Sequence, residues 1–258
     1  MHNRVENIKN AMLGKEFQTK RNGKCFIIDY KSYNNVLVKF YEPPCEVRCR
    51  MGALKSGNIS NPLYPSVCDK GFIGVGEYSS KDTRVYSLWK RMLARAYSDK
   101  YHAKYSTYKD VTVCKEWLNF QNFAEWCYDQ KFFSAKDEKG NSYHLDKDVL
   151  VKGNKIYSPK FCRFVPSEVN TILLKRGKSR GVCLIGVCEQ KQNGGYLANV
   201  KHSGRNVHLG SFNTEIGAFQ AYKKAKESYI KEVSEIWKDR IDDVVYQALL
   251  EYQVEISD

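Results

Sequence analysis

The sequence predicts an α+β protein built from three small units and a closing helix. Two changes of hydrophobic periodicity are the basis of this prediction. Apolar and polar residues alternate between turn signals before Gly76, recur at helical spacing after Thr83, and alternate again after Arg180. The expected units are residues 1–77, 78–175 and 180–235, followed by a helix within 236–258.

Composition supports folded units and indicates a polyanionic partner. Hydrophobic residues make up 42% of the 258 residues and aromatic residues 13%, which is enough for several cores. The formal net charge is +13 and the sequence pI is about 9.2, so nucleic acid is the favoured partner. No apolar run approaches the ~20 residues of a membrane-spanning helix, and no signal peptide opens the chain. We therefore expect a cytoplasmic protein without a membrane partner.

The cysteine pattern favours reduced thiols. The chain has nine Cys, an odd number spread along its length. Cys45 and Cys49 lie four apart and Cys183 and Cys188 five apart, and neither spacing is the CxxC pair of a structural zinc site. Buried, reduced cysteines are therefore expected, and a Cys-ligated zinc is the alternative.

Residues 1–77 predict a short helix at 4–13 and a small β module. Asn22-Gly23 is a strong hairpin signal, and Pro43-Pro44 separates two further apolar runs. Four short strands with tight turns favour an SH3-like barrel or a curled sheet. The stretch at 55–76 is rich in Gly, Pro, Asn and Ser and is expected to be a loop or linker. The predicted strands are 16–19, 24–30, 36–41 and 45–51.

Residues 78–142 predict two amphipathic helices. The first spans 83–97 and the second 119–128, with a loop at 101–107 and a short strand at 111–113 between them. Arg91 and Arg95 lie four apart on the exposed side of the first helix, where they are expected to contact DNA phosphates.

Residues 143–174 combine polar side chains with a strand–turn–strand–helix pattern. His144, Asp146 and Asp148 alternate along the first strand, so they are expected to share a face. A turn at 153–154 and a second strand at 164–165 follow. Ser167 is the expected N-cap of a short helix, with Asn170 on its first turn.

This region resembles the ββα-metal core of phage-encoded, homing-type HNH endonucleases. The resemblance lies in SLWKRMLARAY, YKDVTVCKEWLNFQNFAEW and YHLDKDVLVKGNKIYSPKFCRFVPSEVNTILL. It implies that Asp146, with Asp148 as the alternate, and Asn170 hold a divalent metal, Mg²⁺ or Mn²⁺. The ion would stabilise the leaving oxygen while a base activates water against a phosphodiester.

Two residues depart from the family pattern. Lys147 stands where the family has its His general base, and Phe161 stands where it has a central Asn. His144 is the nearby imidazole, before Asp146 instead of after it. The expected catalytic set is therefore His144, Asp146, Lys147 and Asp148, and the alternative is a half-buried hairpin with polar surface residues.

Residues 180–235 predict three strands, at 185–189, 196–201 and 206–210, and a helix capped by Thr214. The stretch GVCEQKQNGGYLANVKHSGRNVHLGSFNTEIGAFQAYKKAK resembles the ethylene-response-factor (APETALA-type) DNA-binding domain. The resemblance implies that the sheet lies in the major groove. A basic linker precedes it and is expected to follow phosphates. The expected DNA contacts are Lys175, Arg176 and Lys178 in the linker and Lys191, Lys201, His202, Arg205 and His208 on or beside the strands.

Together these features predict a metal-dependent, homing-type endonuclease that binds double-stranded DNA. One ββα site per chain nicks one strand, and a double-strand break requires a dimer; the oligomeric state is open. If the protein is phage-encoded, it acts in the bacterial host cytoplasm. The alternative is a catalytically decayed DNA-binding protein, a repressor or interference factor. A third option is RNA binding, since aromatic and basic residues alternate in both β units.

Overall fold

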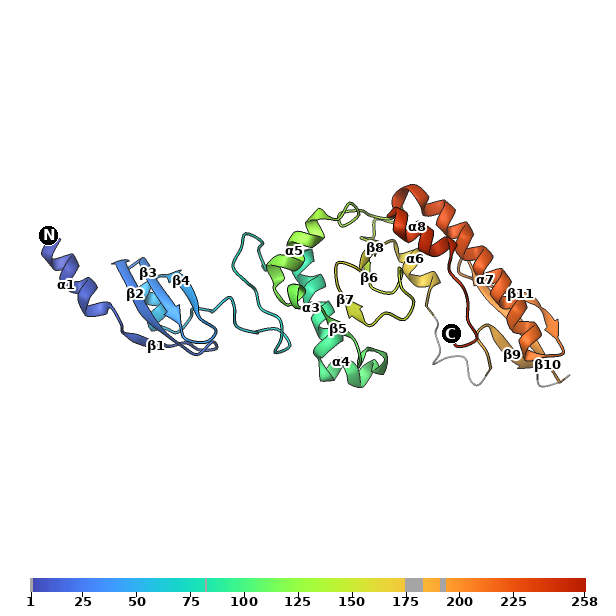
Figure 1. Cartoon of the computed structure of the whole chain (residues 1–258), viewed down its shortest axis with the longest axis horizontal. Coiled ribbons are helices and arrows are strands. Elements are labelled where there is room, and N and C mark those ends of the chain that lie inside the picture. Colours follow the sequence, from blue (N-terminus) through green and yellow to red (C-terminus); the bar gives the residue numbers. More distant parts are fainter. Residues whose placement is uncertain (1, 82, 175–182, 191–193) are drawn as a thin grey trace. The chain divides into compact units, whose positions relative to one another are not determined.

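The computed structural model describes residues 2–81, 83–174, 183–190 and 194–258. The chain folds as two compact units, residues 1–127 and 128–258 (Figure 1). Helices and strands are both present in each unit, as the predicted α+β class requires. Within the described residues, no helix is both long and apolar enough to cross a membrane. None of the nine cysteines, all of which lie within the described residues, forms a disulfide.

The first unit opens with a helix and an antiparallel meander. α1 (His2–Met12) precedes β1 (Glu16–Gln18), β2 (Lys24–Ser32), β3 (Asn35–Phe40) and β4 (Cys45–Cys49), which pair in the order β1-β2-β3-β4. The predicted strands are confirmed. Of the two predicted shapes, a barrel or a curled sheet, the barrel is wrong. Among the described residues, β1 pairs only with β2 and β4 only with β3, so both remain edges of an open sheet. The chain turns into α2 (Met51–Lys55) directly after β4.

One face of this sheet carries the core of the meander. β3 alternates between half-buried and fully buried residues, and Val36, Val38 and Phe40 are its buried members. They pack with Ile27 of β2 and Leu54 of α2. The period-two pattern of the sequence therefore places this face correctly.

The Gly- and Pro-rich stretch after α2 forms no regular element but is tied to the helices that follow. The Phe72 N–H donates to the Leu118 carbonyl at 2.9 Å, and the Phe72 carbonyl accepts from Phe120 N–H at 2.9 Å. The Gln121 side chain bonds to the backbone of Ile73 and Tyr78. This loop is thus packed against the second half of its unit.

The helical half of the first unit contains both predicted helices, α3 (Arg84–Tyr97) and α5 (Phe120–Asp129). Thr83 caps α3 by accepting from Tyr86 N–H at 3.2 Å. Trp89 is fully buried, and its indole N–H donates to the Trp117 carbonyl at 2.7 Å. The shorter elements between them are α4 (Asp99–Lys104), the 3₁₀ helices η1 (Ser106–Tyr108) and η2 (Lys115–Leu118), and β5 (Thr112–Val113).

The loop predicted at 101–107 is wrong, because α4 and η1 occupy it. Ser98 starts α4, since its hydroxyl accepts from Tyr101 N–H at 3.4 Å. Ring contacts among the tyrosines of this stretch add packing that a polar loop would lack. Capping and local ring contacts therefore outweigh the weak hydrophobic periodicity here.

The second unit begins with the predicted hairpin and helix. β6 (His144–Asp146) pairs antiparallel with β8 (Arg163–Val165), and α6 (Ser167–Ile172) follows; β7 (Ile156–Tyr157) lies between them in sequence. Pro166, not Ser167, is the N-cap of α6, and it makes no side-chain capping bond. Ser167 is already the first helical residue.

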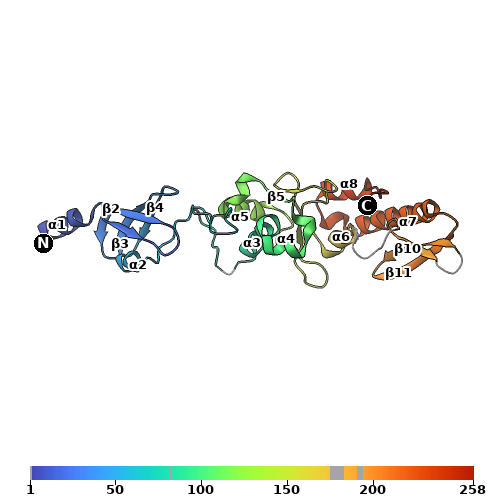
Figure 2. The ribbon, with the colours of Figure 1, turned by 90° about the horizontal axis from the view of Figure 1, so that it is seen from below.

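A three-stranded sheet and a long helix complete the second unit. β9 (Val187–Gln190), β10 (Gly195–His202) and β11 (Arg205–Phe212) pair in the order β11-β10-β9. α7 (Glu215–Trp237) runs along one face of this sheet (Figure 2). Thr214 caps it as predicted, accepting from Gly217 N–H at 3.1 Å.

The helix predicted within 236–258 is present but covers only part of that range. α7 continues through Trp237, and the 3₁₀ helix η4 (Lys238–Arg240) follows it. Only then does α8 (Asp243–Leu250) begin, with Asp242 as its N-cap. Trp237 is buried and its indole N–H donates to Glu168 of α6 at 2.9 Å, so tertiary contacts extend α7 beyond the predicted end of the domain.

Candidate DNA-binding face and ββα hairpin

The pairing of β6 with β8 and the position of α6 bring two predicted site residues, His144 and Asn170, together. His144 lies opposite Val165 and Asp146 opposite Arg163. α6 starts two residues after β8, so Asn170 returns to the hairpin, and its amide nitrogen lies 3.3 Å from Nδ1 of His144. Both side chains are polar, and His144 is exposed. The hairpin and helix thus bring an imidazole and an amide together on one side.

Asp146 serves the backbone of its own loop. Its Oδ1 accepts from Asp148 N–H at 2.6 Å and from Val149 N–H at 2.7 Å. The strand ends at Asp146, so Asp148 lies in the bend beyond it, and the expected common strand face is wrong for that residue. Burial raises the pKa of Asp146, although the two backbone donors act in the opposite direction.

Lys147, at the position where the resemblance implies a general base, fixes the conformation of the loop after β6. Its ammonium donates to both carboxylate oxygens of Asp148, at 2.7 and 2.6 Å, and to the Asn154 carbonyl at 2.6 Å. The side chain is only 9% exposed, compared with 46% for Asp148. A buried ammonium with three acceptors is a structural ion pair, and its charge neutralises the carboxylate of Asp148.

Asn154 adds further hydrogen bonds that fix this loop, and it was not among the predicted site residues. Its amide nitrogen donates to the carbonyls of Lys147 and Ile156, both at 2.8 Å. Its Oδ1 accepts from Ile156 N–H at 3.2 Å. The sequence marks Gly153-Asn154 only as a turn, because Asn is common in turns for its backbone conformation as well as for side-chain bonding.

The donors available to a divalent ion at this hairpin are few. Among the described residues, no group of three or more His, Cys, Asp or Glu side chains is placed to hold a metal. Asp146 keeps one carboxylate oxygen outside its two backbone bonds, and Asn170 contributes an amide. Mg²⁺ commonly uses one or two carboxylates together with water and substrate phosphates, so this set fits an ion only if phosphate supplies further ligands.

The three-stranded sheet presents a polar face on the side opposite α7. Ala198 and Val200 of β10 are buried against α7, together with Val187 of β9. Because side chains alternate, the residues between them point to the other side, which we call the outer face. Cross-strand pairing places Asn199 opposite His208 and Lys201 opposite Asn206. The outer face consists of Cys188, Gln190, Leu197, Asn199, Lys201, Asn206, His208 and Ser211.

Among the described residues of these strands, no carboxylate lies on the outer face. Glu189 pairs with Tyr196, which packs toward α7, so the acidic side chain belongs to the opposite side. Lys201, Asn206 and His208 are exposed, and the His208 ring lies 3.3 Å from the Asn199 amide oxygen. Donors and acceptors are therefore displayed at strand spacing on a positively charged surface.

His202 and Arg205, both predicted as DNA contacts, lie elsewhere on the sheet. They pair with each other beside the Ser203-Gly204 turn, in register with the α7 side. The His202 Nε2 lies 2.9 Å from a carboxylate oxygen of Glu232, and its ring is 4.0 Å from that of Tyr229. His202 is thus engaged by α7, whereas Arg205 is exposed at the hairpin tip.

The remaining predicted contacts divide between the first unit and the undescribed segments. Arg91 is exposed on α3, and its Nε donates to the Ser87 carbonyl at 3.3 Å. The guanidinium of Arg95 lies 5.8 Å from the centroid of the Tyr108 ring. The predicted contacts outside the described residues are Lys175, Arg176, Lys178 and Lys191.

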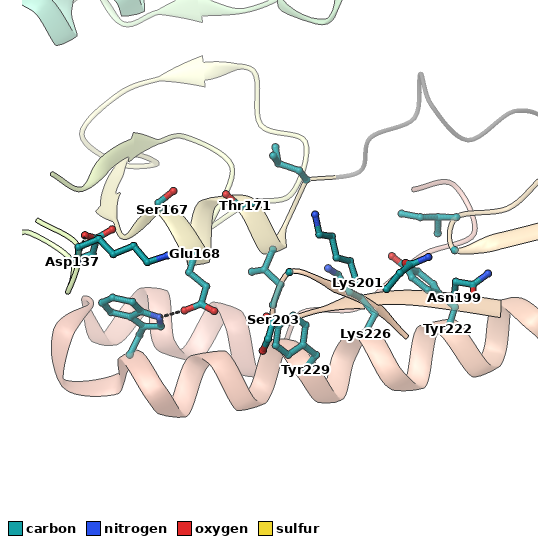
Figure 3. Close-up of a pocket in the computed structure, with 18 of the residues that line it drawn as sticks. Asp137, Ser167, Glu168, Thr171, Asn199, Lys201, Ser203, Tyr222, Lys226 and Tyr229 are labelled. Atoms are coloured by element: carbon teal, nitrogen blue, oxygen red, sulfur yellow. Dashed lines mark hydrogen bonds between the residues drawn. The ribbon is translucent and has the colours of Figure 1, made fainter. Parts of the chain in front are cut away.

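A groove of about 820 Å³ lies between α6 and the end of β10. Ser167 and Thr171 of α6 line one side, and Asn199 and Lys201 of β10 line the other (Figure 3). β9 pairs with β10 only as far as Ala198. The rest of β10 has no paired strand on that side among the described residues, and it borders the groove. α7 contributes further lining through Tyr222, Lys226 and Tyr229.

The two ends of this groove differ in charge. Lys201 and Lys226 lie toward the sheet, whereas Asp137 and Glu168 lie toward α6 (Figure 3). Glu168 is bonded to the Trp237 indole, so its carboxylate is already partnered. The positive charge of the groove therefore lies at its sheet end, and the end beside α6 is acidic.

The sequence was also compared with known proteins. No family model matches it, and no match is found among the curated proteins or the solved structures.

Proposed function

We propose that this protein binds double-stranded DNA through the outer face of the sheet β11-β10-β9. The observation that carries the proposal is the cross-strand arrangement of Asn199, His208, Lys201 and Asn206 on a face without carboxylates among the described strand residues. A lysine supplies phosphate or guanine contacts, and Asn side chains are suited to paired hydrogen bonds with adenine. The net charge of +13 adds sequence-independent attraction.

The groove beside β10 supports the same proposal. A duplex lying on the outer face carries a phosphate strand past Lys201 and toward Lys226. Amide and hydroxyl groups of Asn199, Ser167 and Thr171 are neutral donors of the kind that position a DNA backbone. On this view the lysines give affinity, and the outer-face amides and His208 give base preference.

The test is a set of binding isotherms on a selected duplex and on a scrambled duplex. Lys201→Ala and His208→Ala are compared with Lys224→Ala, which removes an exposed charge from α7. We expect the two outer-face variants to lose affinity, with His208→Ala losing about 1 kcal/mol more on the selected duplex. Equal affinities of all three variants and the wild type would remove the sheet as the DNA-binding surface.

A second candidate function is metal-dependent DNA cleavage at the ββα hairpin, as in a homing-type endonuclease. The contact between His144 and Asn170, next to Asp146, favours it. Mg²⁺ or Mn²⁺, if bound with a substrate phosphate, would supply Lewis-acid stabilisation of the leaving oxygen. Asp146 and Asn170 would hold the ion, and His144 is the side chain able to accept a proton from water.

DNA binding without cleavage, as in a repressor or interference factor, is the first candidate because of Lys147. The family's base position is occupied by a buried ammonium that bonds to Asp148 and Asn154. A protonated amine with three acceptors cannot take a proton from water. The geometry therefore favours a hairpin that supports the DNA-binding unit.

Incubation of duplex DNA with Mg²⁺ or Mn²⁺, with and without chelator, separates the two candidates. If the hairpin cleaves, Asp146→Asn should abolish cutting and leave duplex affinity unchanged, because Asn keeps an oxygen for the two backbone bonds. Cutting that persists when Asp146 and Asp148 are both replaced would exclude this site. Absence of cutting by the wild type, with duplex binding intact, supports the first candidate.

A further inference from the structure

A cluster of tyrosines lies where α3 meets α4 in the first unit. The centroids of Tyr101 and Tyr105 are 4.8 Å apart, and those of Tyr101 and Tyr108 are 5.5 Å apart in an edge-to-face contact. We call these three rings the tyrosine patch. Tyr105 is 41% exposed, and the other two are half-buried. The planes of Tyr101 and Tyr105 are inclined by 40° and those of Tyr101 and Tyr108 by 85°, so the rings pack on Tyr101 and leave Tyr105 as the most exposed of the three.

Cations surround the tyrosine patch. The Lys104 ammonium lies 5.3 Å from the Tyr105 ring centroid, and the Arg95 guanidinium lies 5.8 Å from that of Tyr108. Lys100 and Lys109 are exposed in the same stretch. Residues 90–110 contain six Lys or Arg and two Asp, so this short segment carries a net charge of +4. A negatively charged partner is therefore favoured.

Local hydrogen bonds fix the backbone that carries the tyrosine patch. The His102 Nε2 lies 2.8 Å from the Arg95 carbonyl and ties α4 back to α3. Tyr105 N–H donates to the Tyr101 carbonyl at 2.9 Å, and Ser98 caps the start of α4. The three rings thus lie in or directly beside the short helices α4 and η1, so binding requires little ordering of the protein.

We propose that the tyrosine patch binds unpaired bases of a single-stranded polynucleotide. A base stacks on the Tyr105 ring, and Lys104 moves from the ring to the adjoining phosphate. Paired bases in a duplex do not expose their faces to such a ring, whereas every unpaired base does. An acidic peptide would match the charge but offers no planar surface. This site is separate from the sheet of the second unit and does not depend on duplex binding there.

The test uses the full chain with a fluorescent fifteen-nucleotide oligo-dT, an oligo-rU of equal length and a duplex of equal length. Tyr105→Ala should weaken single-strand binding roughly tenfold, since base–aromatic stacking has that magnitude. Tyr105→Phe keeps the ring and should stay within about twofold of the wild type. The matched control is Tyr33→Ala, which removes a tyrosine that is 55% exposed in the turn between β2 and β3. Circular dichroism of each variant checks folding.

The outcomes are distinct. A loss with Tyr105→Ala alone, on either single strand, supports the patch, and the ratio of the two affinities decides between DNA and RNA as the natural strand. Duplex affinity should be unchanged in that variant, so failure here is separable from failure of the sheet. Equal losses with Tyr105→Ala and Tyr33→Ala, or none with either, would overturn the proposal.

Discussion

The loop after β6 and the outer face of the sheet β11-β10-β9 use polar residues in opposite ways. In the loop, Asp146, Lys147 and Asn154 direct their polar atoms inward, each to backbone or to a neighbouring charge. On the outer face, Lys201 and Asn206 are exposed. The residue types of a motif therefore do not reveal its role. Polar side chains that bond within the protein indicate a stabilising role, and polar side chains exposed to solvent indicate a binding surface.

The largest expected effect comes from removing the buried ammonium of the loop. Lys147→Ala deletes bonds to Asp148 and to the Asn154 carbonyl, and leaves that carbonyl without its charged donor. We expect the free energy of unfolding to fall by about 3 kcal/mol, measured by urea denaturation. The exposed Lys160→Ala is the control and should change stability by less than about 0.5 kcal/mol. A loss below about 1 kcal/mol for Lys147→Ala would mean that the hydrogen bonds of this ammonium contribute little to the free energy of unfolding.

Two asparagines test the comparison directly. Asn154→Ala removes three side-chain bonds within the loop and should lower the free energy of unfolding by about 2 kcal/mol, without changing duplex affinity. Asn206→Ala, on the outer face, should lower duplex affinity and leave the free energy of unfolding unchanged. Parallel unfolding curves and binding isotherms measure both. If Asn206→Ala destabilises the fold as much as Asn154→Ala does, the inward–outward distinction is incorrect.

A smaller, pH-dependent effect is expected at Asp146. Burial raises its pKa, so the folded protein binds that proton more tightly than the unfolded chain does. The resulting stabilisation is fully present below the unfolded pKa and is lost as the pH rises through the folded pKa. Asp146→Asn lacks this proton, so its stability relative to the wild type should increase as the pH is raised from below the unfolded pKa to neutrality.

Urea denaturation of both proteins across this range measures the difference between their free energies of unfolding. A difference that stays flat would mean that folding leaves the pKa of Asp146 unshifted. A difference that moves against the variant with rising pH would show that the carboxylate is stabilised in the fold. That result would also increase the case for Asp146 as a metal ligand, since an ionised carboxylate is the form that binds the ion.

The smallest effect concerns the salt dependence of DNA binding. If Lys201 neutralises one phosphate, Lys201→Ala should reduce the slope of log affinity against log salt by about one. Lys224→Ala changes the net charge equally but lies on the exposed side of α7, so its slope should match that of the wild type. Duplex titrations at several salt concentrations give both slopes. Equal slopes for the two variants would mean that bulk charge, not the outer face, holds the DNA.

Much of the fold follows from local sequence. The alternation of β3, the helical stripe of α3 and the caps at Thr83 and Thr214 were all predictable, because each depends on residues within one or two turns. The ββα order of β6, β8 and α6 was likewise predictable from apolar runs and turn residues. The open edges of the first sheet were not, because barrel closure depends on whether distant strands pair.

The direction of each site side chain was decided by tertiary structure. Asp146 and Lys147 have the residue types of an active site, yet Asn154 and the backbone after β6 take up much of their bonding capacity. His202 turns to Glu232, thirty residues away in the sequence. The sequence alone determines which polar groups the chain carries, their net positive charge and the strands on which they alternate. Only packing decides which of them face one another and which face solvent, because a buried polar group must bond to whatever the fold places beside it.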